Sequence, residues 1–219
     1  MKQAGIDRRR AAYTRVRTAP RRQLTPLGAV FRGAAAGVIG TLAMDLVMYR
    51  RYRRDQGTEA FGEWEFSADV TGWDNAPAPA QVGRRVVDGL FERELPDSAA
   101  RQTNNIMHWG YSVSAAVGYG LLAASLRRPR VGYGLLFGAG MWAFSYVILP
   151  PMHLYKPITE YDAKTLGKDL TAHLAYGLGT AAALRALLPH RGRRGAARPA
   201  APGPMFGAAS RRVRHNVER

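Results

Sequence analysis

Two long stretches of the chain contain no charged residue at all, and they constrain its fold more than any other feature. Residues 106–126 and 131–150 lack Asp, Glu, Lys and Arg. A helix on the surface of a soluble protein carries charged residues on its outward face, so helices of this composition are unusual in water. The hydrocarbon core of a bilayer needs about 20 mostly apolar residues in helical form, and both stretches are long enough to cross it.

Two further stretches are nearly as apolar. Residues 27–49 carry only Arg32 and Asp45 as charged residues, and residues 170–188 carry only Arg185. The sequence therefore predicts an all-α membrane protein with four spans. A pair of buried helices in a soluble protein is the alternative that periodicity alone leaves open.

Small residues recur four apart in every predicted span. Helices in lipid gain little from the hydrophobic effect, and they associate where small residues let their backbones approach. The pattern predicts a compact four-helix transmembrane bundle. The residues concerned are Gly33 and Gly37; Gly110, Ser114 and Gly118; Gly134 and Gly138; and Ala175, Gly179 and Ala183.

Basic residues are concentrated in the terminal segments 1–26 and 189–219 and in the link 127–130 between the second and third predicted spans. Cytoplasmic flanks of membrane spans carry the excess of Lys and Arg. Both termini are therefore predicted to be cytoplasmic, with residues 50–105 forming an outer loop. The arginine-rich run 50–54 opposes this orientation, but the larger basic total lies on the other side.

The formal net charge of +16 bears on the partners of the chain. Basic flanks attract anionic lipid headgroups, so a bilayer with anionic lipids is the expected partner. No nucleic acid is expected, because the basic segments lack the interleaved aromatic residues on which bases stack. Another membrane protein or a second copy of the chain is left open as a lateral partner. The chain has no cysteine, which excludes disulfides and thiolate metal sites.

The outer loop 50–105 holds most of the acidic residues and one amphipathic segment. Apolar residues recur there at helical spacing, which predicts a helix at about 80–94. Its polar face has mixed sign, which favours docking onto the bundle over lying on the bilayer surface. Asp97 or Ser98 is predicted to cap the helix of the second span.

Several ionisable residues fall near the outer ends of the predicted spans. Asp45 lies about one turn from the end of the first span, and His108 lies at the start of the second. Asp169 and His173 are four apart at the start of the fourth, and His153 follows the third. Ionisable residues inside spans are costly and often functional. Asp45, His108, Asp169 and His173 are therefore the candidate site, and a divalent metal, a proton relay and a structural polar cluster all remain open.

Scattered residues between Gly33 and Leu188 resemble the YagU-like family of small bacterial inner-membrane proteins. The resemblance implies a multi-span protein of the bacterial inner membrane, tied to stress or acid tolerance, with no catalytic residue to carry over. The acidic loop and the Arg-rich tails depart from the family pattern. The matching residues are Gly33-x-x-Ala36-Gly37, His108-Trp109-Gly110, Val117-Gly118-Tyr119, Pro150-Pro151 and Asp169-x-x-x-His173.

The motifs of standard enzyme classes are missing from the sequence. It contains no G-x-x-x-x-G-K phosphate loop, no G-x-S-x-G and no H-E-x-x-H. No catalytic residue and no cofactor is therefore predicted, although a divalent metal is left open. The leading expectation is a non-enzymatic accessory, scaffold or stress-related membrane protein. Proton, ion or metal translocation or binding is the first alternative, and a metal-dependent membrane enzyme is the second.

Overall fold

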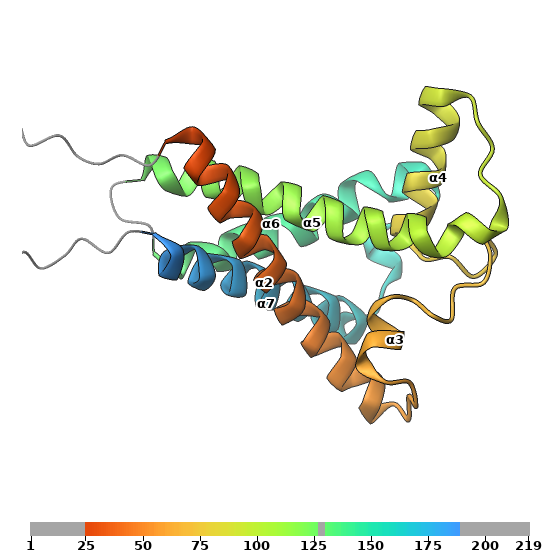
Figure 1. Ribbon diagram of the computed structural model, residues 1–219. Coiled ribbons are helices and arrows are strands. Elements are labelled where there is room, and N and C mark those ends of the chain that lie inside the picture. The colour runs from red at the N-terminus through yellow and green to blue at the C-terminus, as the bar shows by residue number, and fades with distance from the viewer. Residues whose placement is uncertain (1–24, 127–129, 189–219) are drawn as a thin grey trace, which may run out of the picture. The chain divides into compact units, whose positions relative to one another are not determined.

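The computed structural model describes residues 25–126 and 130–188, and this part of the chain is helical without a β-strand. The prediction of an all-α fold is confirmed for these residues. The predicted basic segments 1–26 and 189–219 lie almost wholly outside them. The long helices are α2 (Pro26–Arg54), α5 (Ala100–Ser125), α6 (Tyr133–Ile148) and α7 (Ala163–Leu187); the short ones are α3 (Phe61–Glu65) and α4 (Ala78–Phe91), with 3₁₀ turns at Asp97–Ala99, Pro150–Met152 and Ile158–Glu160 (Figure 1).

Two helical segments in the described part of the chain are long and apolar enough to cross a membrane. They are α2 and the segment Tyr133–Met152, which contains α6, and they correspond to the first and third predicted spans. Helices α5 and α7 cover the second and fourth predicted spans, but each begins six or seven residues earlier than predicted. These extra turns are polar. A four-span protein therefore remains a prediction.

The long helices pack in the order α5, α2, α7, α6, and each contacts its neighbours in this order. Helices α5 and α6 would close the ring, but their backbones scarcely approach. Side chains bridge them instead, and the ring centroids of Tyr119 and Phe137 lie 4.6 Å apart. The ends of the long helices that adjoin residues 25, 126, 130 and 188 lie together, away from α3 and α4 (Figure 1).

Glycines set the close approach of the helices where the small-residue pattern predicts it. A Cβ atom added at Gly33 would lie 2.9 Å from Cα of Val117 on α5. A Cβ atom added at Gly134 on α6 would lie 2.2 Å from the carbonyl oxygen of Gly177 on α7. A side chain at either position would push the helices apart, so these contacts depend on glycine.

The predicted packing row on α5 is wrong. An added Cβ at Gly110 or Gly118 would meet no atom within 4 Å in the described structure. The helix instead buries Ser112, Ala116 and Gly120, and the last two of these contact α2. These residues are also spaced four apart, so the sequence offered two rows of small residues, and the helix packs through the other one.

The predicted outer helix forms as α4 and docks on α5. Ala80 and Gly83 are buried, and a Cβ atom added at Gly83 would lie 2.5 Å from the side chain of Thr103. The prediction that Asp97 or Ser98 caps the following helix is wrong. Both residues lie in a 3₁₀ turn that leads directly into α5, and no side chain caps that helix.

Candidate functional site

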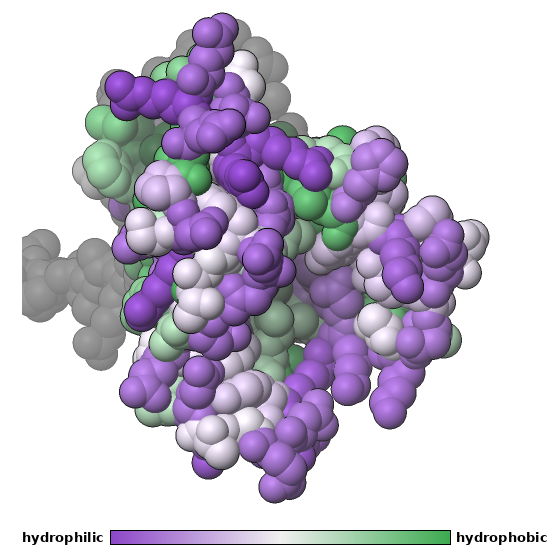
Figure 2. All heavy atoms as spheres, turned by 90° about the vertical axis from the view of Figure 1, so that its right-hand side faces the viewer, coloured by the Kyte–Doolittle hydropathy of each residue, from purple (hydrophilic) through white to green (hydrophobic). Residues whose placement is uncertain are grey.

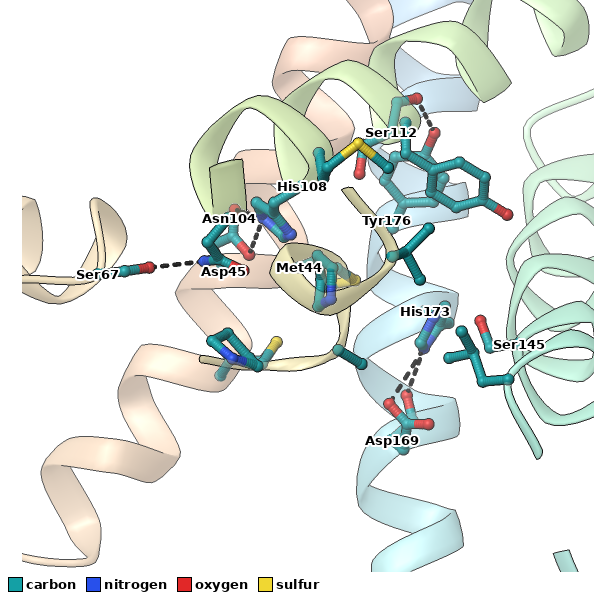
Figure 3. Close-up of a pocket in the computed structure, with 18 of the residues that line it drawn as sticks. Met44, Asp45, Ser67, Asn104, His108, Ser112, Ser145, Asp169, His173 and Tyr176 are labelled. Carbon is teal, nitrogen blue, oxygen red and sulfur yellow. Dashed lines mark hydrogen bonds and ion pairs between the residues drawn. The ribbon is translucent and has the colours of Figure 1, made fainter. Parts of the chain in front are cut away.

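A cavity of about 770 Å³ lies between the halves of α5 and α6 that are nearest α3 and α4. Residues of all four long helices line it, and α3, α4 and the segment between them also contribute. We call it the central cavity. Figure 2 shows the face of the molecule that carries α3 and α4, where hydrophilic side chains predominate and apolar ones show between them. Figure 3 shows the polar side chains that point into the cavity.

The register between α2 and α5 brings Asp45 and His108 together. The two helices run antiparallel, and Gly37 packs against Val113 and Ala116. Asp45 lies about two turns beyond Gly37 on α2, and the antiparallel register places His108 opposite it. Both carboxylate oxygens of Asp45 lie 3.3 Å from Nε2 of His108.

A third side chain, Glu65, reaches the same point from the end of α3. Hydrogen bonds from α5 hold the chain just after Glu65: Arg101 Nε donates to the carbonyl of Phe66, and Asn104 donates to Ser67 Oγ. Trp64 packs on Tyr49 of α2 with 5.4 Å between ring centroids. These contacts fix α3 against both helices and turn Glu65 inward.

Asp45, Glu65 and His108 form a cluster in which one ligand atom from each lies within 4.8 Å of the other two. Asp45 is 2% exposed and Glu65 is 8% exposed. Neither carboxylate oxygen of Glu65 has a hydrogen-bond partner within the described residues. A buried carboxylate without a partner is costly, so Glu65 as it stands lacks a positively charged or hydrogen-donating partner of its own.

Burial also changes the protonation of Glu65. Loss of water around the carboxylate, together with repulsion from Asp45, raises the pKa of Glu65 to about 7. The carboxyl group is therefore divided between its neutral and charged forms near neutral pH. A cation bound at the cluster would favour the charged form.

Asp169 and His173 form a second pair, on the α7 wall of the cavity (Figure 3). Nδ1 of His173 lies 3.0 Å from the backbone carbonyl of Asp169 and 3.3 Å from its Oδ1. A carbonyl oxygen only accepts hydrogen bonds, so Nδ1 carries the proton. Burial and the charge of Asp169 raise the pKa of nearby Tyr155 to about 12.

The structure thus divides the predicted site residues into two pairs that line one cavity. Asp45 joins His108, while Asp169 joins His173 and lies outside the metal-compatible cluster. His153 does not line the central cavity, and it follows the 3₁₀ turn Pro150–Met152 with a left-handed backbone.

Glu65 is the site residue that the sequence analysis missed. It sits among other acidic residues of the outer loop, and only the flanking Trp64 and Phe66 distinguish it from them. Its role depends on a contact between α3 and α5, which lies far from it in the sequence. The five methionines that line the cavity were also missed, because only the packing of the helices brings them together.

The donor set of the cluster fits a divalent cation. One imidazole nitrogen and two carboxylates are ligands that zinc, manganese and iron accept. The unpartnered buried carboxylate of Glu65 is the observation that favours a cation over a purely structural cluster. Three protein ligands leave coordination positions for water or another ligand from the cavity side.

Comparisons with protein-family models, with curated proteins and with solved structures found no match to this chain.

Proposed function

We propose that this chain is a membrane protein that binds a divalent transition-metal cation through Asp45, Glu65 and His108. The observation that carries the proposal is the buried Glu65 carboxylate, which has no hydrogen-bond partner in the described structure and lies with Asp45 and His108 at metal-ligand spacing. A bound cation supplies the missing charge and offsets the cost of burying two carboxylates together.

The chemistry of the donors narrows the class of cation. Mg²⁺ and Ca²⁺ prefer shells made wholly of oxygen ligands, whereas an imidazole suits Zn²⁺, Fe²⁺ and related ions. Two anionic carboxylates and a neutral imidazole balance the charge of one divalent ion. Zn²⁺ and Fe²⁺ are therefore the ions to test first.

Apolar side chains on the outer faces of the helices support a location in the membrane. Phe31, Leu122, Leu136 and Val147 are each about two-thirds exposed or more. Water would oppose such exposure, whereas lipid favours it. We propose four spans, with both termini in the cytoplasm of a bacterium and the cluster near the outer side of its inner membrane.

The cavity and its cluster favour a binding function over the accessory or scaffold role expected from the sequence. A scaffold binds its partners through the lateral faces of its helices, and this role does not explain why Asp45, Glu65 and His108 are buried together. The scaffold role remains the alternative. It predicts that replacing His108 or Glu65 leaves the affinity of the protein for cations unchanged.

Equilibrium dialysis of the purified protein in detergent tests the proposal. We expect about one Zn²⁺ per chain, and at least a tenfold loss of affinity in His108→Ala and in Glu65→Gln. His153→Asn is the matched control, because it removes a histidine outside the central cavity and should leave the affinity unchanged. Equal affinity in all four proteins would overturn the proposal.

A further inference from the structure

The central cavity has an electrostatic character opposite to that of the chain. The chain contains 32 Lys and Arg against 16 Asp and Glu. Among the described residues, those that line the cavity include no Lys or Arg. Five carboxylate residues line it: Asp45, Glu59, Glu65, Asp69 and Asp169. Such a cavity repels anions and favours a cationic occupant.

The walls between these acids are apolar and adaptable. All five methionines in the described part of the chain line the cavity: Met44, Met48, Met107, Met141 and Met152. Methionine side chains are flexible and polarisable, so they adjust to ligands of different shape. Aromatic rings, among them Tyr111, Phe144 and Tyr155, add faces that attract organic cations.

The volume suits an organic molecule better than a bare ion. Ligand pockets for drug-sized molecules commonly measure about 300–1,000 Å³, and this cavity measures about 770 Å³. A single metal ion at the Asp45–Glu65–His108 cluster would leave most of this space to another occupant.

Asp169 is the carboxylate that the α7 wall of the cavity offers to such an occupant. Its side chain is 29% exposed, whereas that of Asp45 is 3% exposed. Nδ1 of His173 lies beside Oδ1 of Asp169, and Oδ2 is buried without a hydrogen-bond partner in the described structure. Within the described residues no Lys or Arg forms an ion pair with Asp169, so this carboxylate is available to a cationic occupant of the cavity.

We propose that the central cavity binds a lipophilic organic cation, with its charge beside Asp169 and its apolar body along the methionine-lined wall. This inference goes beyond the proposed metal binding and does not depend on it. The metal cluster lies on α2, α3 and α5, while Asp169 lies on α7.

Two probes of the same shape and opposite charge test the charge preference. Tetraphenylphosphonium is permanently cationic and forms neither hydrogen bonds nor metal bonds, and tetraphenylborate is its anionic counterpart. We expect the purified protein, in detergent with EDTA present, to bind the phosphonium saturably, with no saturable binding of the borate. Equal binding of the two probes, or no saturable binding of the phosphonium, would overturn the proposal.

Variants then locate the site. We expect Asp169→Asn to weaken phosphonium binding about tenfold or more, because a buried charge contact is lost. Glu160→Gln is the matched control, since it neutralises an exposed acid that does not line the cavity. Ser145→Phe places a ring in the cavity from α6 and should weaken binding without changing charge. Unchanged binding in both Asp169→Asn and Ser145→Phe would overturn the proposal.

The same variants separate the two proposals. His108→Ala should lose Zn²⁺ affinity and keep the phosphonium, while Asp169→Asn should do the reverse. If no protein binds Zn²⁺ but the phosphonium results hold, metal binding fails and the organic-cation site stands.

Discussion

Both carboxylate oxygens of Asp45 lie 3.3 Å from Nε2 of His108, across the contact between α2 and α5. Asp45 is almost fully buried, and a buried carboxylate depends on a partner. Its partner is His108. Close packing of Gly37 against α5, about two turns before Asp45 on α2, sets the register of the two helices and so brings His108 opposite Asp45. The geometry of this pair in the site therefore depends on how closely α2 and α5 pack.

Removal of His108 should destabilise the protein even when no metal is present. His108→Ala leaves Asp45 buried without its hydrogen bond, and a bond to a charged group contributes about 1.5–3 kcal/mol. We expect the free energy of unfolding to fall by about this amount, measured by SDS titration in mixed micelles with EDTA. His153→Asn should change it by less than about 0.5 kcal/mol. Equal stability of the two variants would contradict the contact.

Glu65 should make the metal-free protein less stable as the pH rises. Its pKa is about 7 in the folded state, against 4.5 for a free carboxyl group. Between these values the folded state binds more protons than the unfolded state, so the contribution of Glu65 to stability is full below pH 4.5 and is lost through pH 7. Glu65→Gln should remove this dependence, as measured by thermal unfolding in EDTA across this pH range.

Saturating Zn²⁺ should reverse the loss of stability with rising pH. The ion binds only the deprotonated carboxylate of Glu65, so it stabilises the folded protein more as the pH rises. Glu94→Gln, at an exposed position in the outer loop, is the control and should behave like the unaltered protein. A pH profile in Glu65→Gln that matches the unaltered protein would show that another group carries the effect.

Substitution by alanine should weaken helix packing at Gly177 and leave it intact at Gly118. A Cβ atom at Gly177 would lie 2.0 Å from the carbonyl oxygen of Gly134, whereas one at Gly118 would meet nothing within 4 Å in the described structure. We expect Gly177→Ala to lower the free energy of unfolding by about 1–3 kcal/mol. Gly118→Ala should leave it unchanged or raise it by up to about 1 kcal/mol, since alanine favours helix. A similar loss in both variants would argue against the α6–α7 contact.

The sequence predicts the long helices well, because long apolar stretches and small-residue spacing are local properties. It also places Asp45 and His108 at one depth, since both lie near the ends of predicted spans. It does not predict which α5 row packs, because Gly110 and Ala116 belong to rows of equal quality. It does not predict Glu65, whose position depends on Asn104 of α5, which donates a hydrogen bond to Ser67 across the fold.

The proposed orientation can be tested with single cysteines, because the chain has none of its own. Glu94 lies in the predicted outer loop and Arg130 in the predicted cytoplasmic link, and both are exposed. In intact cells, an impermeant maleimide should label Glu94→Cys and leave Arg130→Cys unlabelled. Permeabilised cells should allow both to react. Labelling of Arg130→Cys alone would invert the topology.

X-ray absorption at the zinc edge of the Zn²⁺-loaded protein tests the central claim most directly. The account predicts one imidazole nitrogen at about 2.0–2.1 Å with oxygen ligands completing the shell, and loss of the imidazole signal in His108→Ala but not in His173→Ala. A shell without imidazole, or an imidazole signal that disappears only in His173→Ala, would contradict the assignment of Asp45, Glu65 and His108 as the metal ligands.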